Sequence, residues 1–142
     1  MRVSSQLGNN GTAVISTCGT YRYVLKRRIP CLLRWDRPCL FIMLNPSVAN
    51  AEVDDPTIRR CMNFAARESC TALTVINLFA LRTTDPEQLR RHSDPCGPEN
   101  KFYQQEELNK HGERGPIVCA WGAHPIARCP RKSVKDFQGF LR

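Results

Sequence analysis

The apolar run Cys39–Leu44 ends abruptly at Asn45 and Pro46. A run without alternating polar side chains is typical of a strand that is covered on both faces, as in a parallel sheet. Proline has no backbone N–H to donate, so Pro46 ends the strand. Two further runs have the same character, Leu73–Leu81 and Ile117–Gly122. Such strands alternating with helices predict an α/β fold with a mainly parallel central sheet and helices on both faces.

Helical patterns lie between and after these apolar runs. Asp55 and Pro56 form a strong helix start, with Asp55 as the N-cap and Pro56 at the first helical position. A second Asp-Pro pair, at 85–86, predicts a short helix that ends at about residue 91. Residues 98–110 predict a third helix, with Phe102 among its apolar contacts. Residues 131–141 predict a last, basic helix.

Ahead of the first apolar run, Thr12–Cys18 and Tyr21–Ile29 are β-prone and flank a Gly-Thr turn. In the second stretch polar and apolar residues alternate imperfectly, which predicts an antiparallel hairpin with one face in water. The length of 142 residues fits one domain. We predict a single three-layer α/β/α domain over residues 12–125, after a flexible N-terminus (1–11) and before a basic C-terminal segment (126–142).

The composition excludes several classes of protein. With 42% hydrophobic and 24% charged residues, the chain is neither collagen-like nor a coiled coil nor wholly disordered. No apolar run approaches the roughly 20 residues of a membrane-spanning helix. The N-terminus also lacks the apolar core of a secretory signal. We therefore expect a cytoplasmic protein without a membrane partner, whose oligomeric state the sequence does not indicate.

The net charge of +8 is concentrated near the two ends of the chain. Residues 20–37 and 125–142 are rich in Lys and Arg, whereas the acids outnumber the bases in residues 38–124. Basic ends favour a polyanion partner such as nucleic acid, DNA in particular. Solvated faces and a basic tail are the alternative interpretation of the same charges.

The eight cysteines include no pair in a CxxC spacing, so they do not match a zinc ribbon or finger. Cys39 and Cys119 lie in apolar runs, where cysteine behaves as a small hydrophobic residue. We expect reduced, mostly structural thiols, with an iron–sulfur cluster from distant cysteines as the alternative. No cofactor and no metal ligand set is predicted.

In open α/β sheets, ligands bind outside the carboxyl ends of the strands. The loops after the three apolar runs should therefore converge. The candidate site residues of these loops and the helix that follows are Leu44, Asn45, Pro46, Ser47, Asp55, Arg59, Asn77, Phe79, Arg82, Trp121 and Gly122. None of the apolar runs is followed by a Gly-rich phosphate-binding motif (GxGxxG or GxxxxGK[ST]) or by the GxSxG motif of serine hydrolases. The sequence therefore gives little support to a nucleotide-cofactor enzyme or a serine hydrolase.

Four blocks of the chain resemble a bacterial and phage family, the domain-of-unknown-function family 1643. They are FIMLNPSVANAEVDDPTIRRCMNFA, VINLFALRTTDPEQLRR, DPCGPEN and VCAWGAHP. The blocks match in the same order, from about Arg22 to Pro125. The family label itself implies no activity.

A more distant similarity connects Met43–Ser47 to the uracil-DNA glycosylase superfamily. In those enzymes an apolar strand ends in a motif of the type G-[IQE]-[NDA]-P-[GY], whose polar residue positions the attacking water. Asn45 falls at that position, although Met43 replaces the leading Gly. The superfamily has a second, His-containing motif near the C-terminus. Residues 126–142 lack it, which predicts a truncated or divergent end.

The resemblance implies base excision from DNA, a hydrolase activity of the N-glycosylase type. Asn45 would orient water, Asn77 would bind a base edge, Phe79 would stack on a flipped base and Arg82 would hold phosphates. Each residue also has a structural interpretation. Asn45 is then a turn residue before proline, Asn77 a hydrogen-bonded group within the sheet and Phe79 a core side chain.

Two other functions stay open. The first is a module with the same fold but without catalysis, which binds nucleic acid or has a regulatory role. The second is a metal-dependent phosphoryl-transfer enzyme, in which Asp54 and Asp55 would ligate Mg²⁺ together with Ser47. Such acids also cap helices, and Arg59 in the same helix would contact a phosphate or carboxylate or face solvent.

Overall fold

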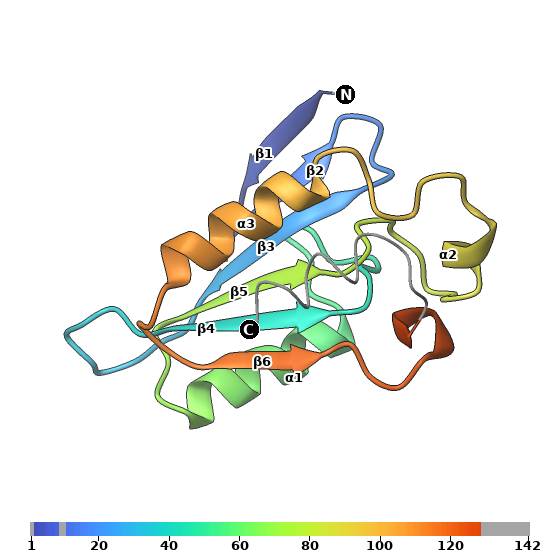
Figure 1. The fold of residues 1–142 in the computed structure, drawn as a ribbon. Helices are drawn as coiled ribbons and strands as arrows, with labels where there is room; N and C mark the ends of the chain where they lie inside the picture. The colour runs from blue at the N-terminus through green and yellow to red at the C-terminus, as the bar shows by residue number, and fades with distance from the viewer. Residues whose placement is uncertain (1, 9–10, 129–142) are drawn as a thin grey trace.

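A computed structural model describes residues 2–8 and 11–128, which form one six-stranded sheet with helices on both faces (Figure 1). The strands are β1 (Val3–Leu7), β2 (Gly11–Ser16), β3 (Arg22–Arg28), β4 (Pro38–Met43), β5 (Ala72–Asn77) and β6 (Ile117–Ala120). The helices are α1 (Pro56–Arg67), α2 (Gln88–Arg91), α3 (Asn100–His111) and the 3₁₀-helix η1 (Pro125–Arg128). The predicted α/β class is confirmed.

The sheet is mostly antiparallel, and the prediction of a mainly parallel sheet is wrong. Its strand order is β1-β2-β3-β5-β4-β6, and only the pairs β5–β4 and β4–β6 are parallel. The predicted hairpin is present as β2 and β3, but β3 also pairs antiparallel with β5. The N-terminal residues expected to be flexible include β1, which pairs with β2 from Val3 to Leu7. The uracil-DNA glycosylase-like three-layer sandwich is therefore not confirmed.

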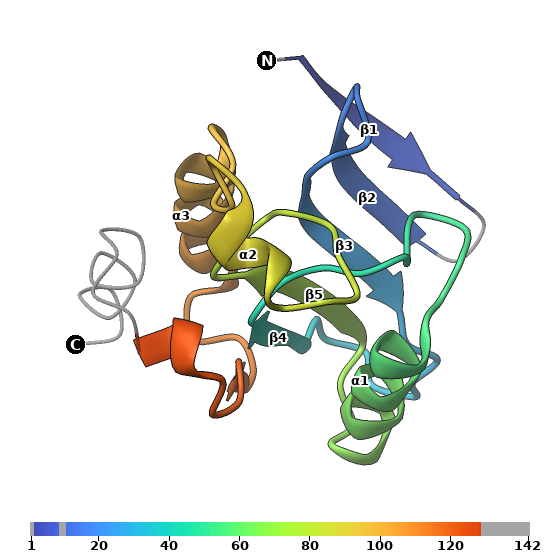
Figure 2. The ribbon, with the colours of Figure 1, turned by 90° about the vertical axis from the view of Figure 1, so that its right-hand side faces the viewer.

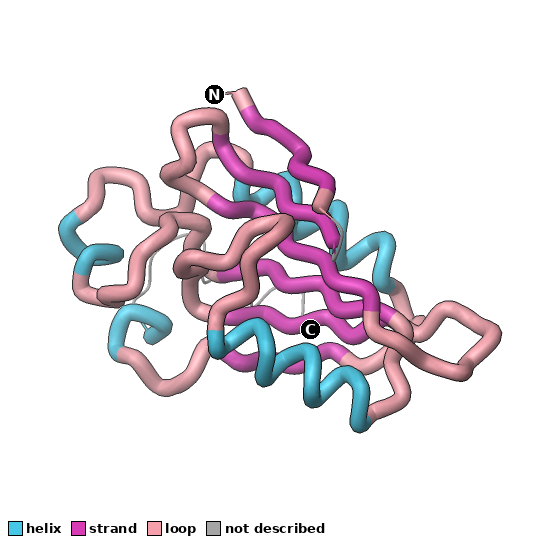
Figure 3. The backbone as a smooth tube through the Cα atoms, turned by 180° about the vertical axis from the view of Figure 1, so that it is seen from behind, coloured by secondary structure: helices cyan, strands magenta, loops and turns pink. Residues whose placement is uncertain are grey.

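Helices α1 and α3 lie against opposite faces of the sheet (Figure 2, Figure 3). The apolar residues divide accordingly into two clusters. The cluster on the α1 face includes Leu25, Cys39, Phe41, Ile58, Cys61, Ala65, Leu73 and Val75. The cluster on the α3 face includes Tyr21, Tyr23, Leu40, Ile42, Ile76, Leu78, Phe79 and Leu89. Strands β4 and β5 are buried on both faces, in keeping with their mainly apolar sequences, although β5 also buries the polar residues Thr74 and Asn77.

Helix α1 begins as predicted, because the Asp55 carboxylate accepts the backbone N–H of Ile58 across 2.8 Å. The second Asp-Pro pair forms a turn instead, in which Asp85 accepts the N–H of Glu87, and α2 follows only at Gln88. Helix α3 covers nearly the predicted range. Its Phe102 is 58% exposed and is not one of its core contacts.

Strand β6 is present, but the expectation that it is buried on both faces is wrong. It lies at an edge of the sheet, where Ile117 is 41% exposed and Cys119 is exposed. Downstream of it, Ile126 and Ala127 of η1 pack into the core of the α3 face. The last predicted helix, 131–141, lies outside the described residues.

The carboxyl end of β4 is a topological switch point. The chain leaves β4, crosses the sheet through α1 and returns as β5 on one side of β4. It then crosses the opposite face through α3 and returns as β6 on the other side of β4. The loops after β5 and β6 thus diverge around the loop after β4, which is where open α/β sheets form crevices.

Candidate functional site

The candidate site is built on the loop Leu44–Val48, which leaves β4 at the switch point. This loop runs beside the segment that follows β5, since the N–H of Phe79 donates to the carbonyl oxygen of Leu44 across 3.0 Å. The N–H of Thr83 donates to the carbonyl oxygen of Pro46, also across 3.0 Å. The two loops therefore form one unit.

Asn45 holds this unit together through its side-chain amide. Its Nδ2 donates to the carbonyl oxygens of Pro46 and Thr83, each at 2.9 Å, and lies 3.4 Å from that of Leu81. Because all three partners are acceptors, the atom that faces them must be the nitrogen. Within the described residues Oδ1 makes no hydrogen bond. The half-buried amide is thus fixed in orientation and has one acceptor left over.

Arg82 connects the same loop to the turn between β2 and β3. Its guanidinium donates to the carbonyl oxygens of Ser47 (3.2 Å), Val48 (3.2 Å) and Gly19 (3.3 Å). The planar guanidinium has five N–H donors, so it can bind several carbonyl oxygens at once. The sequence predicts a phosphate contact for Arg82, but the structure gives its guanidinium three backbone partners. Arg82 therefore positions the loops.

Asn77 and Phe79 differ from their predicted roles. Phe79 is fully buried in the core of the α3 face, so the stacking role predicted for it does not fit and the core interpretation holds. Asn77 is only 1% exposed, and neither atom of its side-chain amide has a hydrogen-bond partner among the described residues. Its backbone carbonyl, by contrast, accepts from Gln104 at 2.7 Å and from Asn100 at 3.2 Å. Neither the predicted contact with a base edge nor the predicted hydrogen bond within the sheet describes this buried amide.

The side chain of Asn77 lies on the α1 face, by alternation with Leu73 and Val75. Asn77 pairs in register with Met43, whose sulfur lies 3.9 Å from the Cys61 sulfur of α1. The unpartnered amide therefore lies at the carboxyl end of the parallel strands, beneath the amino-terminal half of α1.

The two adjacent acids are occupied by structural contacts. Asp55 caps α1 and is 7% exposed. Asp54 forms an ion pair with Arg27, at 2.8 Å from its Nε, and Arg59 is exposed with its guanidinium 3.4 Å from the Asp54 carbonyl oxygen. Residues 2–8 and 11–128 contain no cluster of three His, Cys, Asp or Glu side chains that could hold a metal ion.

Sequence reasoning did not single out Arg22, which strict alternation would place on the same face as Val24 and Lys26. Tyr23 is an extra residue in β3, because Val14 pairs with Val24 and Ile15 pairs with Arg22. This bulge turns Arg22 onto the α1 face, where it is 2% exposed and donates to the Ala49 carbonyl oxygen at 2.9 Å. In the part of the chain that the structure describes, its Nε has no hydrogen-bond partner.

Burial lowers the pKa of the Arg22 guanidinium to about 10, against the opposing effect of the nearby Asp55 carboxylate. Arg22 and Asn77 are thus two polar groups with unused hydrogen-bonding capacity at the same end of the sheet. A break in alternation was the one sequence signal that could have indicated the bulge.

The remaining candidates lie around this core. Leu44 packs against the apolar cluster of the α3 face, and Pro46 is buried. Ser47 is half-buried, and its hydroxyl makes no hydrogen bond within the described residues. Trp121 packs against the same cluster at the end of β6, followed by the exposed Gly122 with a φ of +72°. The structure thus joins Leu44–Ser47 to Arg82 directly, with Trp121 and Gly122 at the neighbouring strand end.

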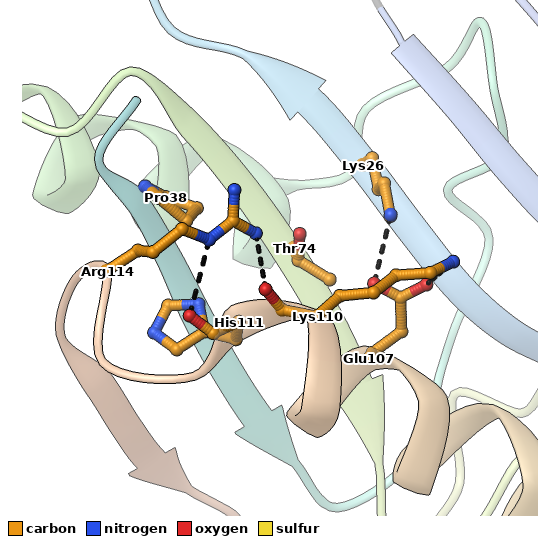
Figure 4. A pocket seen from close by; sticks show the side chains of 7 residues that line it. All are labelled: Lys26, Pro38, Thr74, Glu107, Lys110, His111 and Arg114. Atoms are coloured by element: carbon orange, nitrogen blue, oxygen red, sulfur yellow. Dashed lines mark hydrogen bonds and ion pairs between the residues drawn. The ribbon is translucent and has the colours of Figure 1, made fainter. Parts of the chain in front are cut away.

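A separate cavity of 350 Å³ lies at the other end of the sheet, between α3 and the strands (Figure 4). It is lined by Lys26, Pro38, Thr74, Glu107, Lys110, His111 and Arg114. Its cations are paired with carboxylates: Lys26 lies 2.9 Å from Glu107, Lys110 contacts Glu107 and Glu106, and Arg114 contacts Asp36. This balance of charges indicates a network that anchors α3 on the sheet.

The fold and the loop cluster define a mixed α/β domain with a polar site at the carboxyl ends of its parallel strands. The chain belongs to a family described as proteins of unknown function (DUF1643), whose model matches residues 22–139. The match confirms the family resemblance and extends past Pro125. No curated protein and no solved structure matches the chain. Within the described ranges, no helix is long and apolar enough to cross a membrane.

Proposed function

We propose that this chain binds nucleobases of DNA at the switch-point loops and excises them by a glycosylase-type hydrolysis. The orientation of Asn45 carries the proposal. Three backbone acceptors hold its Nδ2, so within the described residues Oδ1 is left as an acceptor without a donor. The resemblance of Met43–Ser47 to the water-positioning motif of uracil-DNA glycosylases supports the same role.

Glycosidic-bond hydrolysis of a nucleoside develops positive charge on the sugar and negative charge on the departing base. Such a reaction needs a positioned water more than a strong nucleophile. Oδ1 of Asn45 can accept a hydrogen bond from that water and so direct its lone pair toward the sugar carbon. The net charge of +8 favours a DNA partner through contacts with phosphates.

A non-catalytic base-binding module is the second candidate, and one observation favours it. Asn77 and Phe79, two of the predicted base contacts, are buried in the structure. Metal-dependent phosphoryl transfer has less support, because the Asp54 carboxylate is paired with Arg27 and that of Asp55 caps α1.

The test combines binding and cleavage on the full chain. Fluorescence anisotropy measures its affinity for a labelled duplex with one uracil, a G·T mismatch or no lesion, and alkali followed by a gel detects base loss. Cleavage of a lesion duplex should fall at least 100-fold in Asn45→Ala. The exposed Asn109→Ala serves as the matched control and should cleave like the wild type.

Circular dichroism establishes that both variants are folded. Binding without cleavage would identify the non-catalytic module, and cleavage that requires Mg²⁺ would favour phosphoryl transfer. Absence of binding to all three duplexes would overturn the proposal.

A further inference from the structure

Three cysteines gather at the amino ends of β4 and β5, the opposite end of the sheet from Asn45. Cys39 is the second residue of β4, and Cys70 lies two residues before β5. Both are fully buried on the α1 face. Cys31 is half-buried in the loop that joins β3 to β4 and projects beyond the sheet (Figure 1).

Two contacts bring these three cysteines close together. Cys39 and Cys70 belong to the same buried cluster on the α1 face, and their side chains lie near enough to affect each other's pKa. The Cys31 sulfur lies 3.6 Å from the carbonyl oxygen of Ser69, the residue bonded to Cys70. The turn around Ser69 has a φ of +56° and presents Cys70 inward, where its N–H donates to the Ala65 carbonyl oxygen at 2.9 Å.

Only Cys31 of the three is open to reagents. It lines two adjoining cavities, of 890 and 660 Å³, between its loop and α1. Burial raises the pKa of the Cys39 thiol to about 12 and also raises that of Cys70, against the Arg37 charge, which lowers both. Since the thiolate is the reactive form, the buried pair should react slowly with an oxidant in solution.

We propose that Cys31, Cys70 and Cys39 form an oxidation site in which the accessible thiol passes a disulfide to the buried pair. The oxidant is a hydroperoxide. The Cys31 thiolate attacks its O–O bond and becomes a sulfenic acid, and the peroxide is reduced to water or an alcohol. The Cys70 thiol attacks the Cys31 sulfur and expels water, which forms a Cys31–Cys70 disulfide. The Cys39 thiol then attacks the Cys70 sulfur, so that Cys31 leaves as a thiol.

The product is a buried disulfide between Cys39 and Cys70, formed by loss of two electrons and two protons from that pair. It closes a loop that contains β4, Asn45 and all of α1. The bond between the start of β4 and the end of α1 restricts the unfolded chain, so the oxidised protein should melt at a higher temperature. This inference does not depend on the proposed function.

The experiment treats the reduced full chain with hydrogen peroxide at pH 7.5, quenches it with iodoacetamide and maps disulfides by mass spectrometry after trypsin digestion. Cleavage after Arg34 separates Cys31 from Cys39. In the wild type the expected product is the Cys39–Cys70 link, which dithiothreitol reverses. Cys31→Ser should form this link at least tenfold more slowly. Cys119→Ser removes an accessible cysteine outside the site and should form the link at the wild-type rate.

Cys39→Ser provides a second measurement, because it should stop at the Cys31–Cys70 link. Accumulation of the Cys31–Cys70 disulfide in this variant would support the proposed transfer from Cys31 to the buried pair, independently of the rates. The proposal is overturned if Cys31→Ser forms the buried link as fast as the wild type. It is equally overturned if Cys31 reaches the sulfinic acid while Cys39 and Cys70 stay reduced.

Discussion

The Nδ2 atom of Asn45 donates a hydrogen bond to the carbonyl oxygen of Thr83 across 2.9 Å, and so joins the loop after β4 to the loop after β5. These residues are 38 positions apart in the chain. The same side chain thus supports the fold through its nitrogen and offers its oxygen to a ligand. Asn45→Ala removes both atoms, so its effects on stability and on activity are measured side by side.

Asn45→Ala should lower the free energy of unfolding by about 1–3 kcal/mol, because within the described residues it leaves the carbonyl oxygen of Thr83 without its donor and removes one of the two donors to that of Pro46. Urea unfolding followed by circular dichroism measures the change. The exposed Asn109→Ala should stay within about 0.5 kcal/mol of the wild type. Equal stability of the two variants would show that the Nδ2 hydrogen bonds of Asn45 do not stabilise the two loops.

Asn77→Leu should leave the free energy of unfolding unchanged or raise it by about 1 kcal/mol. The reason is that both amide atoms of Asn77 are buried without hydrogen-bond partners in residues 2–8 and 11–128, and an apolar side chain of similar shape removes that desolvation cost. Thermal and urea unfolding both report on it. A loss of more than about 1 kcal/mol would show that the amide makes hydrogen bonds to internal water.

Arg27→Met should destabilise the fold by about 3–5 kcal/mol, as expected when one partner of a buried ion pair is removed. Arg27 is 1% exposed, binds the Asp54 carboxylate at 2.8 Å and donates to the carbonyl oxygens of Asn50 and Val53. The exposed neighbour Arg28→Met is the control, measured by the same urea titration. Similar values for both variants would show that Arg27 does not hold the Asn50–Val53 segment.

Cys18 should be alkylated by iodoacetamide with a rate that rises through a midpoint near pH 7. The hydroxyls of Ser16 and Thr20 and the backbone N–H of Thr20 lower the pKa of this exposed thiol from 9.0 to about 7. Since the thiolate reacts, the rate increases as the pH passes the pKa. Peptide mapping of the alkylated protein resolves each cysteine.

The double variant Ser16→Ala, Thr20→Val should move this midpoint toward 9, because it removes two hydrogen bonds that favour the thiolate. Cys119 provides an internal reference, since burial raises its pKa. A Cys18 midpoint at or above that of Cys119 would refute the effect of the two hydroxyls.

Several features of this protein follow from local sequence alone. The Asp55 cap and Pro56 determine where α1 begins, because both act within one helical turn. The apolar runs indicate that β4 and β5 are buried strands, since a strand covered on both faces favours apolar side chains on both of them. The blocks from Phe41 to Pro125 indicate the family, and its model matches residues 22–139.

Other features were decided only by the tertiary structure. The short polar strand β1 exists because β2 offers it an edge, and its own residues have no strong strand pattern. The bulge at Tyr23 places Arg22 on the α1 face and not on the face of Val24, since one extra residue reverses the alternation. The partners of Asn45 come from loops far along the chain. Caps and periodicity are encoded within a few residues, whereas strand order and loop contacts depend on which distant segments pack together.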